Sequence, residues 1–240
     1  MKIAIIGYGK MGQMVETISL EHGHEIVLII DKANQHDLNT ENLSQVDAAI
    51  DFSTPDSAFE NIITCIEANT PIVSGTTGWL NKKSEVEAAC KLQNASFLYA
   101  SNFSIGVNLL FAMNQKLANL MNGFDNYHCE IKETHHIQKL DTPSGTAISL
   151  ANDILKNIQR LDKWELHENT EIKQADLPIT AIREGKVTGK HTIIYDSNVD
   201  TISLSHEAKN RKGFAFGAVM AAEFIKDKKG IFTMQDMLAI

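Results

Sequence analysis

Two histidines, a lysine and a Ser-Gly-Thr turn lie close together between Glu130 and Ala147. The histidines are His135 and His136, and the lysine is Lys139. An imidazole can donate or accept a proton near neutral pH, and an ammonium group supplies a fixed positive charge. Backbone amides at the start of a helix attract anions. This combination suits acid–base chemistry on a small carboxylated substrate.

A helix is expected to position the Ser-Gly-Thr turn. The apolar residues that follow the turn recur at helical spacing: Ala147, Leu150, Ala151, Ile154, Leu155 and Ile158. Pro143 lacks the amide that the first position of a helix leaves unpaired, so we expect the helix to begin there. The amides of residues 144–146 would then lie in the first turn, where the helix dipole favours negative charge.

The same residues allow other interpretations. Adjacent histidines on a strand point to opposite faces, so one of them can simply pack or cap. Thr-Pro-Ser-Gly is also an ordinary sequence for the start of a helix. Metal binding is a third interpretation, with Glu133, His135, His136 and Asp141 as possible ligands. These four lack the spacing of HExxH or of paired Cys-x-x-Cys motifs, so we predict no metal.

Composition limits the possible functions. The chain has 240 residues, 43% hydrophobic and 22% charged, as in a soluble protein with one large or two modest domains. Its net charge of −8 argues against nucleic-acid and membrane partners, because those surfaces repel an acidic protein. Three scattered cysteines fit a reducing compartment. No apolar run is long enough for a membrane span, and the start of the chain resembles a strand rather than a signal peptide. We therefore expect a cytoplasmic protein.

The first half of the chain carries a dinucleotide-binding pattern. A short apolar run leads into Gly7-Tyr-Gly-Lys-Met-Gly12, a helical pattern follows, and a second apolar run ends in Asp31. Gly7 suits a tight turn, Gly9 lets the backbone approach a pyrophosphate, and Gly12 allows close helix–strand packing. Asp31 lies near the spacing of about 20 residues expected for a carboxylate that binds the adenosine ribose. The alternative is a tight turn that binds nothing.

Strands and helices continue to alternate to about residue 104, which predicts a Rossmann-like doubly wound parallel sheet. Ligands of such sheets bind beyond the carboxyl ends of the strands. We therefore expect the cofactor to contact Gly7, Tyr8, Gly9, Lys10, Met11, Gly12, Asp31, Lys32, Phe52, Gly75, Thr76, Thr77, Ala100, Ser101, Asn102 and Phe103. Thr76 and Thr77 would offer hydroxyls to the nicotinamide ribose. Asp31 favours NADH, whereas Lys10 and Lys32 could neutralise the 2′-phosphate of NADPH, so both cofactors fit.

The second half has a different pattern. Strands are predicted at residues 127–133, 179–183, 191–195 and 201–206, and the last two form a hairpin. The helix near residues 143–158 would pack on this sheet. Residues 162–176 are predicted to form an irregular loop, and residues 214–225 a helix. This predicts a C-terminal α+β domain with a mixed sheet, whose free face self-association could cover.

Together, these motifs resemble those of the 4-hydroxy-tetrahydrodipicolinate reductase (dihydrodipicolinate reductase) family of bacterial lysine and diaminopimelate biosynthesis. The resemblance covers nearly the whole chain and depends above all on Glu133-x-His-His-x-x-Lys-x-Asp-x-Pro-Ser-Gly-Thr-Ala147. Further matches are Gly7–Gly12, Asp51-Phe-Ser, Gly75-Thr-Thr-Gly78, Asn102-Phe-Ser-Ile-Gly-Val-Asn108, Arg183-Glu-Gly-x-Val-x-Gly-x-His191, His206-x-Ala-x-x-Arg211 and Phe214-Ala-x-Gly-Ala218.

The resemblance implies NAD(P)H-dependent reduction of the dehydrated form of 4-hydroxy-tetrahydrodipicolinate to tetrahydrodipicolinate. It implies that His135 exchanges a proton and that Lys139 acts as an acid and holds a substrate carboxylate. The dicarboxylate would also contact His136, Ser144, Gly145 and Thr146. The resemblance further implies a dinucleotide-binding domain at residues 1–104 and 214–240, a substrate-binding and oligomerisation domain at residues 105–213, and a homotetramer.

Three positions depart from the family pattern. The loop from Gly7 to Gly12 is one residue shorter than the commoner form, Thr54 stands where many members carry an arginine near the cofactor, and Thr142 replaces an alanine.

Two other functions fit the residues. One is another NAD(P)-dependent reductase of an amino-acid-derived substrate. A thiol-dependent enzyme of that kind needs a cysteine in a candidate loop, and none of the three cysteines lies in one. The other is a non-catalytic dinucleotide sensor, which would have no use for His135, Lys139 and the Ser-Gly-Thr turn together.

Overall fold

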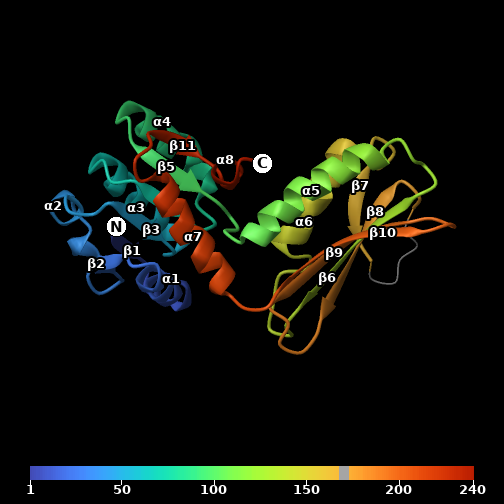
Figure 1. Ribbon diagram of the computed structural model, residues 1–240, viewed down its shortest axis with the longest axis horizontal. Coiled ribbons are helices and arrows are strands. Elements are labelled where there is room, and N and C mark those ends of the chain that lie inside the picture. Colours follow the sequence, from blue (N-terminus) through green and yellow to red (C-terminus); the bar gives the residue numbers. More distant parts are fainter. Residues whose placement is uncertain (168–172) are drawn as a thin grey trace. The chain divides into compact units, whose positions relative to one another are not determined.

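The computed structural model describes residues 1–167 and 173–240, which form two units (Figure 1). The first unit comprises Met1–Ile105 and Lys212–Ile240, and the second comprises Gly106–Arg211. The chain therefore leaves the first unit once, builds the second, and returns to complete the first.

Six parallel strands form the sheet of the first unit, in the order β11-β5-β4-β3-β1-β2. They are β1 (Lys2–Ile6), β2 (Glu25–Ile30), β3 (Ala48–Asp51), β4 (Ile72–Ser74), β5 (Ser96–Tyr99) and β11 (Gly230–Phe232). The central strands are short and apolar because helices cover both of their faces. The predicted Rossmann-like doubly wound sheet is confirmed, and β11 is an additional strand that the sequence did not indicate.

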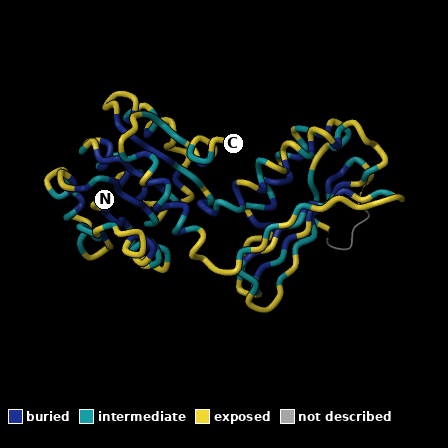
Figure 2. The backbone as a smooth tube through the Cα atoms, in the orientation of Figure 1, coloured by how far each residue is buried: buried dark blue, intermediate teal, exposed yellow. Residues whose placement is uncertain are grey.

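Helices pack on both faces of this sheet, and Figure 2 shows the buried strands between them. One face is covered by α1 (Lys10–Glu21) and α7 (Lys212–Ile225), and the other by α2 (Thr40–Leu43), α3 (Pro55–Glu67) and α4 (Lys83–Leu92). A hydrophobic core lies on each face of the sheet, and β1 contributes to both. Ile3 and Ile5 face α1 and α7, whereas Ala4 and Ile6 face the helices on the other side. The unit ends with α8 (Met234–Leu238).

Helix α7 lies directly against the loop after β5. A Cβ atom at Gly217 would overlap the carbonyl oxygen of Phe103. We expect Gly217→Ala to lower the free energy of unfolding by about 1–3 kcal/mol, the usual cost of overpacking. In the matched control Gly213→Ala, on the same helix, the new Cβ meets nothing within 4 Å. That variant should gain about 0.5–1 kcal/mol from helix propensity. Urea denaturation measures both changes, and equal stabilities would contradict the close approach.

The second unit contains a five-stranded mixed sheet in the order β10-β9-β6-β8-β7. Its strands are β6 (His128–His135), β7 (Lys163–Leu166), β8 (Asp176–Arg183), β9 (Gly189–Asp196) and β10 (Thr201–Ala208). Strand β9 runs antiparallel to β6 and β10, whereas β8 runs parallel to β6 and β7. The predicted mixed sheet is confirmed. The predicted loop at 162–176 is wrong where β7 forms, and its residues 168–172 lie outside the described part of the chain.

Two helices, α5 (Ile105–Met121) and α6 (Gly145–Asn157), cover one face of this sheet. The amide of Asn114 on α5 donates to the carbonyl of Leu150 on α6 at 3.1 Å, which ties the two helices together. Helix α6 begins later than predicted, because Ser144 is its N-cap and accepts a hydrogen bond from the Ala147 amide at 3.2 Å. Serine is a favoured N-cap, so Pro143 precedes the helix instead of starting it.

Candidate active site

The carboxyl ends of five parallel strands lie side by side in the first unit. The residues in register at this edge are, in sheet order, Ile30, Ile6, Asp51, Ser74 and Tyr99. The structure therefore brings together the five loops predicted to bind a cofactor, which begin at Asp31, Gly7, Phe52, Gly75 and Ala100. The chain turns from β1 to β2 on one side of β1 and continues to β3 on the other. Such a switch point is where α/β sheets bind ligands.

The three glycines of the first loop have different surroundings. Gly7 has a φ of +89°, and a Cβ atom there would overlap the Phe52 backbone. A Cβ atom at Gly12 would overlap the carbonyl oxygen of Gly7. Gly9 caps α1 and has nothing within 4 Å of its Cβ position. The N-terminus of α1 therefore faces open space, with Lys10 exposed beside it, which suits a pyrophosphate.

Two adjoining cavities extend along this edge. One, of about 260 Å³, includes Gly7, Tyr8, Asp31 and Lys32 in its lining. The other, of about 430 Å³, includes Lys10, Met11, Gly75, Thr76 and Thr77. Both are also lined by Gly9, Phe52 and Ser53. Two nucleoside positions on either side of a helix N-terminus match the shape of a dinucleotide.

The hydroxyl of Thr76 forms hydrogen bonds within the first unit. It donates to Asp51 Oδ2 at 2.8 Å and accepts from the Ser53 amide at 2.9 Å. Asp51 is fully buried and also accepts from the Ser74 hydroxyl; burial raises the pKa of Asp51 despite its hydrogen bonds. The structure therefore does not support a bond from this hydroxyl to the nicotinamide ribose. Thr77, by contrast, is exposed.

Three other predicted cofactor residues have side chains with partners inside the unit. Phe103 is 2% exposed and packs edge-on against Phe52 with ring centroids 5.9 Å apart. The Tyr8 hydroxyl donates to Glu16 on α1, and Asn102 Oδ1 accepts from the Ser104 amide. Ala100 and Ser101 begin the same loop, and Ser101 is exposed.

In the second unit, β6 carries Glu133 and His135 on the same face because they are two positions apart. His135 ends the strand and is 7% exposed. Its Nδ1 lies 3.2 Å from Glu133 Oε2. His191 on β9 lies opposite Glu133, and its ring packs edge-on against His135 with centroids 5.1 Å apart. His135 Nε2 lies against Gly189, where a Cβ atom would come within 3.0 Å.

Glu133 is a fully buried carboxylate with several partners. Its Oε1 accepts from the Ser144 amide and from Arg183 Nη2, both at 3.0 Å. Its Oε2 faces His135 and, at 3.7 Å, His191 Nε2. Burial favours a higher pKa for Glu133, but the contacts with His135, Ser144 and Arg183 outweigh it and hold the pKa at about 2. Glu133 is therefore an anion at neutral pH.

His191 provides a neutral imidazole beside this anion. Burial, followed by the charge of His135, lowers the pKa of His191 to about 4. Its Nε2 lies 3.1 Å from Ser144 Oγ. Glu133 was predicted only as a possible metal ligand, and Arg183 and His191 had no predicted role. The sequence features that could have indicated them are the Glu-x-His spacing and the motif from Arg183 to His191.

The loop between β6 and α6 holds Lys139. Its Nζ donates to both oxygens of Asp141, at 2.7 and 2.8 Å. Arg183 Nη2 binds the same loop through the Asp141 carbonyl at 2.7 Å and Thr142 Oγ1 at 3.0 Å. A substrate carboxylate that binds Lys139 would therefore either share the ammonium group with Asp141 or displace Asp141 from it.

The N-terminus of α6 divides into two parts. Ser144 is 2% exposed, and its amide and hydroxyl bind Glu133, Ala147 and His191, so direct substrate contact by Ser144 is not supported. Gly145 is exposed, and Thr146 is partly exposed. Because the helix dipole favours an anion here, Gly145 and Thr146 form the candidate carboxylate position.

His136 lies just beyond β6 and is partly buried. Its amide donates to the Val187 carbonyl at 2.8 Å, and its carbonyl accepts from the Lys139 amide at 3.0 Å. The potential metal ligands that the structure groups here are Glu133, His135 and His191, whereas the set considered from the sequence also included His136 and Asp141. Arg183 already supplies positive charge to Glu133, so a hydrogen-bonded charge network explains this trio.

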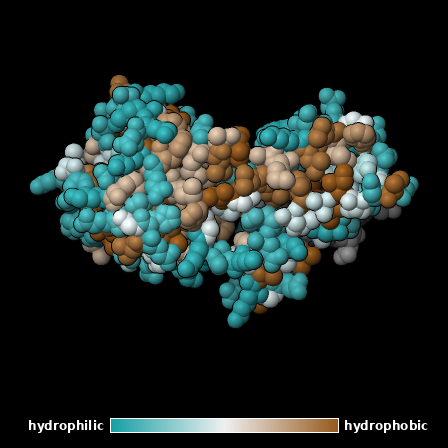
Figure 3. Space-filling view, in the orientation of Figure 1, coloured by the Kyte–Doolittle hydropathy of each residue, from teal (hydrophilic) through white to brown (hydrophobic). Residues whose placement is uncertain are grey.

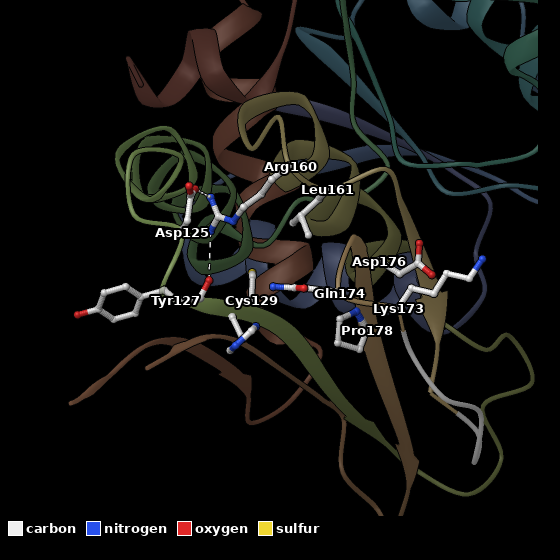
Figure 4. A pocket seen from close by; sticks show the side chains of 10 residues that line it. Asp125, Tyr127, Cys129, Arg160, Leu161, Lys173, Gln174, Asp176 and Pro178 are labelled. Carbon is white, nitrogen blue, oxygen red and sulfur yellow. Dashed lines mark hydrogen bonds and ion pairs between the residues drawn. The ribbon is translucent and has the colours of Figure 1, made fainter. Parts of the chain in front are cut away.

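Another cavity of the second unit lies at the opposite end of β6, and Figure 4 shows its lining. Its volume is about 310 Å³. Arg160 points toward the end of α5, where it donates to the carbonyls of Met121 and Tyr127 at 3.2 and 3.1 Å. None of the predicted site residues lines this cavity, so it is separate from the candidate site.

Comparisons with known proteins agree with this geometry. Residues 1–103 match the family model described as dihydrodipicolinate reductase, N-terminus, and residues 106–238 match dihydrodipicolinate reductase, C-terminus. The 4-hydroxy-tetrahydrodipicolinate reductase of Christiangramia forsetii is 51% identical and covers 100% of this chain and 98% of its own. That of Thermosipho africanus is 33% identical over 99% of this chain and 98% of its own.

Among solved structures, this chain is similar to a dipicolinate-bound dihydrodipicolinate reductase from Paenisporosarcina sp. TG-14. The two are 25% identical with a TM-score of 0.78, and the match covers 98% of both chains. Both family models and full-length relatives thus point the same way. The chain belongs to the dihydrodipicolinate reductase family.

Proposed function

We propose that this protein is an NAD(P)H-dependent reductase that converts the dehydrated form of 4-hydroxy-tetrahydrodipicolinate to tetrahydrodipicolinate in lysine and diaminopimelate biosynthesis. Membership of the family supports this activity. The structural observation that supports it best is the network around Glu133, which links His135 to the N-terminus of α6. The candidate proton carrier and the candidate anion-binding helix end thus both contact the carboxylate of Glu133.

The substrate is a cyclic dicarboxylate, and the second unit has cationic and amide groups suited to it. Lys139 is assigned to one carboxylate, and the first turn of α6 at Gly145 and Thr146 to another. Charge-assisted hydrogen bonds of this kind are stronger than hydrogen bonds between neutral groups. His136 is assigned to the substrate as well. A dicarboxylate is also the ligand named for the Paenisporosarcina relative.

The first unit is assigned to the cofactor. Gly9 and the start of α1 would hold the pyrophosphate, Asp31 and Lys32 the adenosine ribose, and the loops at Gly75 and Ala100 the nicotinamide side. The bound nicotinamide supplies a hydride to the unsaturated ring. His135 then delivers one proton to the carbon next to the one reduced, and recovers its proton from solvent.

We also propose a cytoplasmic homotetramer. Among the described residues no helix covers the second face of the mixed sheet, which carries Ile182 and Ile194. On α5, Met113 and Leu120 are exposed. Apolar residues gather over this helix in Figure 3. A closed tetramer with dihedral symmetry needs two different self-complementary surfaces, and these are two candidates. No helix in the described chain is long and apolar enough to cross a bilayer.

Turnover and ligand titration test this function. Mixing the protein with NADH or NADPH and the condensation product of pyruvate and aspartate semialdehyde should deplete the reduced nicotinamide absorbance. Pyridine-2,6-dicarboxylate should bind to the protein and inhibit this reaction. A dinucleotide sensor would bind NAD(P)H and ignore the dicarboxylate. Oxidation of the cofactor by the semialdehyde alone would favour the other reductase.

A further inference from the structure

We propose that Glu133 is the positioning residue of this reaction, orienting His135 for proton transfer and fixing the helix end that binds the substrate carboxylate. This inference depends on the proposed function. It assigns to one buried carboxylate the task of coupling the acid–base group to the anion-binding group.

The two oxygens of Glu133 divide this task. Oε2 lies 3.2 Å from His135 Nδ1, and Oε1 accepts from the Ser144 amide at 3.0 Å. Because Ser144 is the N-cap of α6, this second bond fixes the start of the helix relative to β6. A shift of Glu133 would therefore displace the proton carrier and the carboxylate position together.

The carboxylate also selects the working nitrogen of His135. An anion beside Nδ1 favours a proton on that nitrogen, which leaves Nε2 to exchange a proton with the substrate. Nε2 faces Gly189, where any side chain would begin with a Cβ atom within 3.0 Å of this nitrogen. An imidazole held by a carboxylate through one nitrogen and reacting through the other is a recurrent catalytic arrangement.

Only an acceptor fits the position of Glu133. The Ser144 amide and Arg183 both donate to Oε1, and the ring nitrogen of His135 approaches Oε2. An ionised carboxylate has two acceptor oxygens and no hydrogen, whereas a glutamine side chain carries an NH₂ group. In Glu133→Gln that group must face one of these donors, so either the imidazole or the helix end loses its partner.

Several charged or titratable groups surround His135. Glu133 lies on its own strand, His191 faces it from β9, and Arg183 is its register partner on β8. The Lys139–Asp141 ion pair belongs to the loop that follows. Of these groups, Glu133 has the ion-pair contact with His135, at 3.2 Å.

The test compares Glu133→Gln with the parent in three measurements. We expect kcat to fall by about 10²-fold, the scale of lost general acid catalysis. We also expect pyridine-2,6-dicarboxylate to bind about tenfold more weakly, as one charge-linked hydrogen bond is lost. NAD(P)H affinity should not change.

A double variant separates positioning from charge balance, because Glu133→Gln leaves the Arg183 guanidinium without its carboxylate. Glu133→Gln combined with Arg183→Met removes both charges, and we expect it to fold but to retain the low kcat and the weakened dicarboxylate binding. The matched control is Glu223→Gln in the first unit. Glu223 also contacts two imidazoles, His24 Nε2 at 2.7 Å and His22 Nδ1 at 3.4 Å, and its loss should leave kcat and the dicarboxylate affinity unchanged.

Two results would overturn the inference. One is a Glu133→Gln enzyme with the parental rate and dicarboxylate affinity. The other is recovery of both in the double variant, since Glu133 would then only neutralise Arg183. Failure of the parent to turn over would instead contradict the proposed function. The dicarboxylate affinities of the variants would still test the link between Glu133 and α6.

Discussion

His135→Gln should lower kcat by about 10²-fold or more while dicarboxylate affinity changes little. Glutamine can hydrogen-bond but cannot carry and release a proton near neutral pH, so the loss is that of general acid catalysis. The side chain is 7% exposed and packs among Glu133, His191 and Gly189, so this substitution changes chemistry more than shape. Steady-state kinetics at saturating substrate gives the effect on kcat.

His128→Gln is the matched control for this prediction. His128 begins the strand that His135 ends, and it is exposed. Its replacement should leave kcat within about twofold of the parent, as for surface changes generally. If both variants turn over at the parental rate, His135 is not the proton donor.

Lys139→Ala should reduce kcat/KM by about 10–150-fold. A hydrogen bond to a charged group contributes about 1.5–3 kcal/mol, and each 1.4 kcal/mol corresponds to a factor of ten. The dicarboxylate inhibitor should weaken by a similar factor, because Lys139 is assigned to a carboxylate that substrate and inhibitor share. Initial rates at low substrate concentration and inhibitor titration measure the two effects.

Lys139→Arg and Lys156→Ala complete this experiment. Arginine keeps the positive charge but not the compact ammonium, so an intermediate loss is expected. Lys156 lies on α6, exposed and 3.8 Å from Asp153, and its removal should have no effect on kcat/KM. An unchanged inhibitor affinity in Lys139→Ala would show that this lysine does not hold the carboxylate.

The first sheet could be predicted because its signals are local. Strands β1 and β2, on either side of the Gly7–Gly12 loop and α1, are short apolar runs, and the glycines mark the turn between β1 and α1. Strands β7 and β11 could not be predicted in this way. Strand β7 reads Lys-Trp-Glu-Leu, which is not an apolar run, and β11 is only Gly-Ile-Phe. Strand β11 exists because it pairs with β5, which is far away in the sequence. Pairing of this kind depends on the tertiary fold.

The candidate site was predictable where its residues are contiguous. His135, Lys139 and the turn before α6 lie in one segment, so their types and spacing indicated chemistry. Arg183 and His191 could not be placed beside them, because their proximity comes from strand register. That register pairs His135 with Arg183 and Glu133 with His191.

Two hydroxyl-bearing residues of the predicted loops could not be assigned from the sequence. Thr76 and Ser144 each place the hydroxyl against a partner inside their own unit. Buried polar atoms need partners, and here nearby buried side chains provide them: Asp51 for the Thr76 hydroxyl and His191 for the Ser144 hydroxyl. A sequence does not reveal whether a loop hydroxyl faces a ligand or an interior polar group.

The return of the chain at Lys212 has a consequence for biosynthesis. While the ribosome is still making the protein, β5 has an unpaired edge, and the side of β1 that bears Ile3 and Ile5 lacks its covering from α7. Both gaps are filled only after the inserted segment Gly106–Arg211 has been translated. The first unit can therefore reach its final packing only after the whole of the second unit has been synthesised.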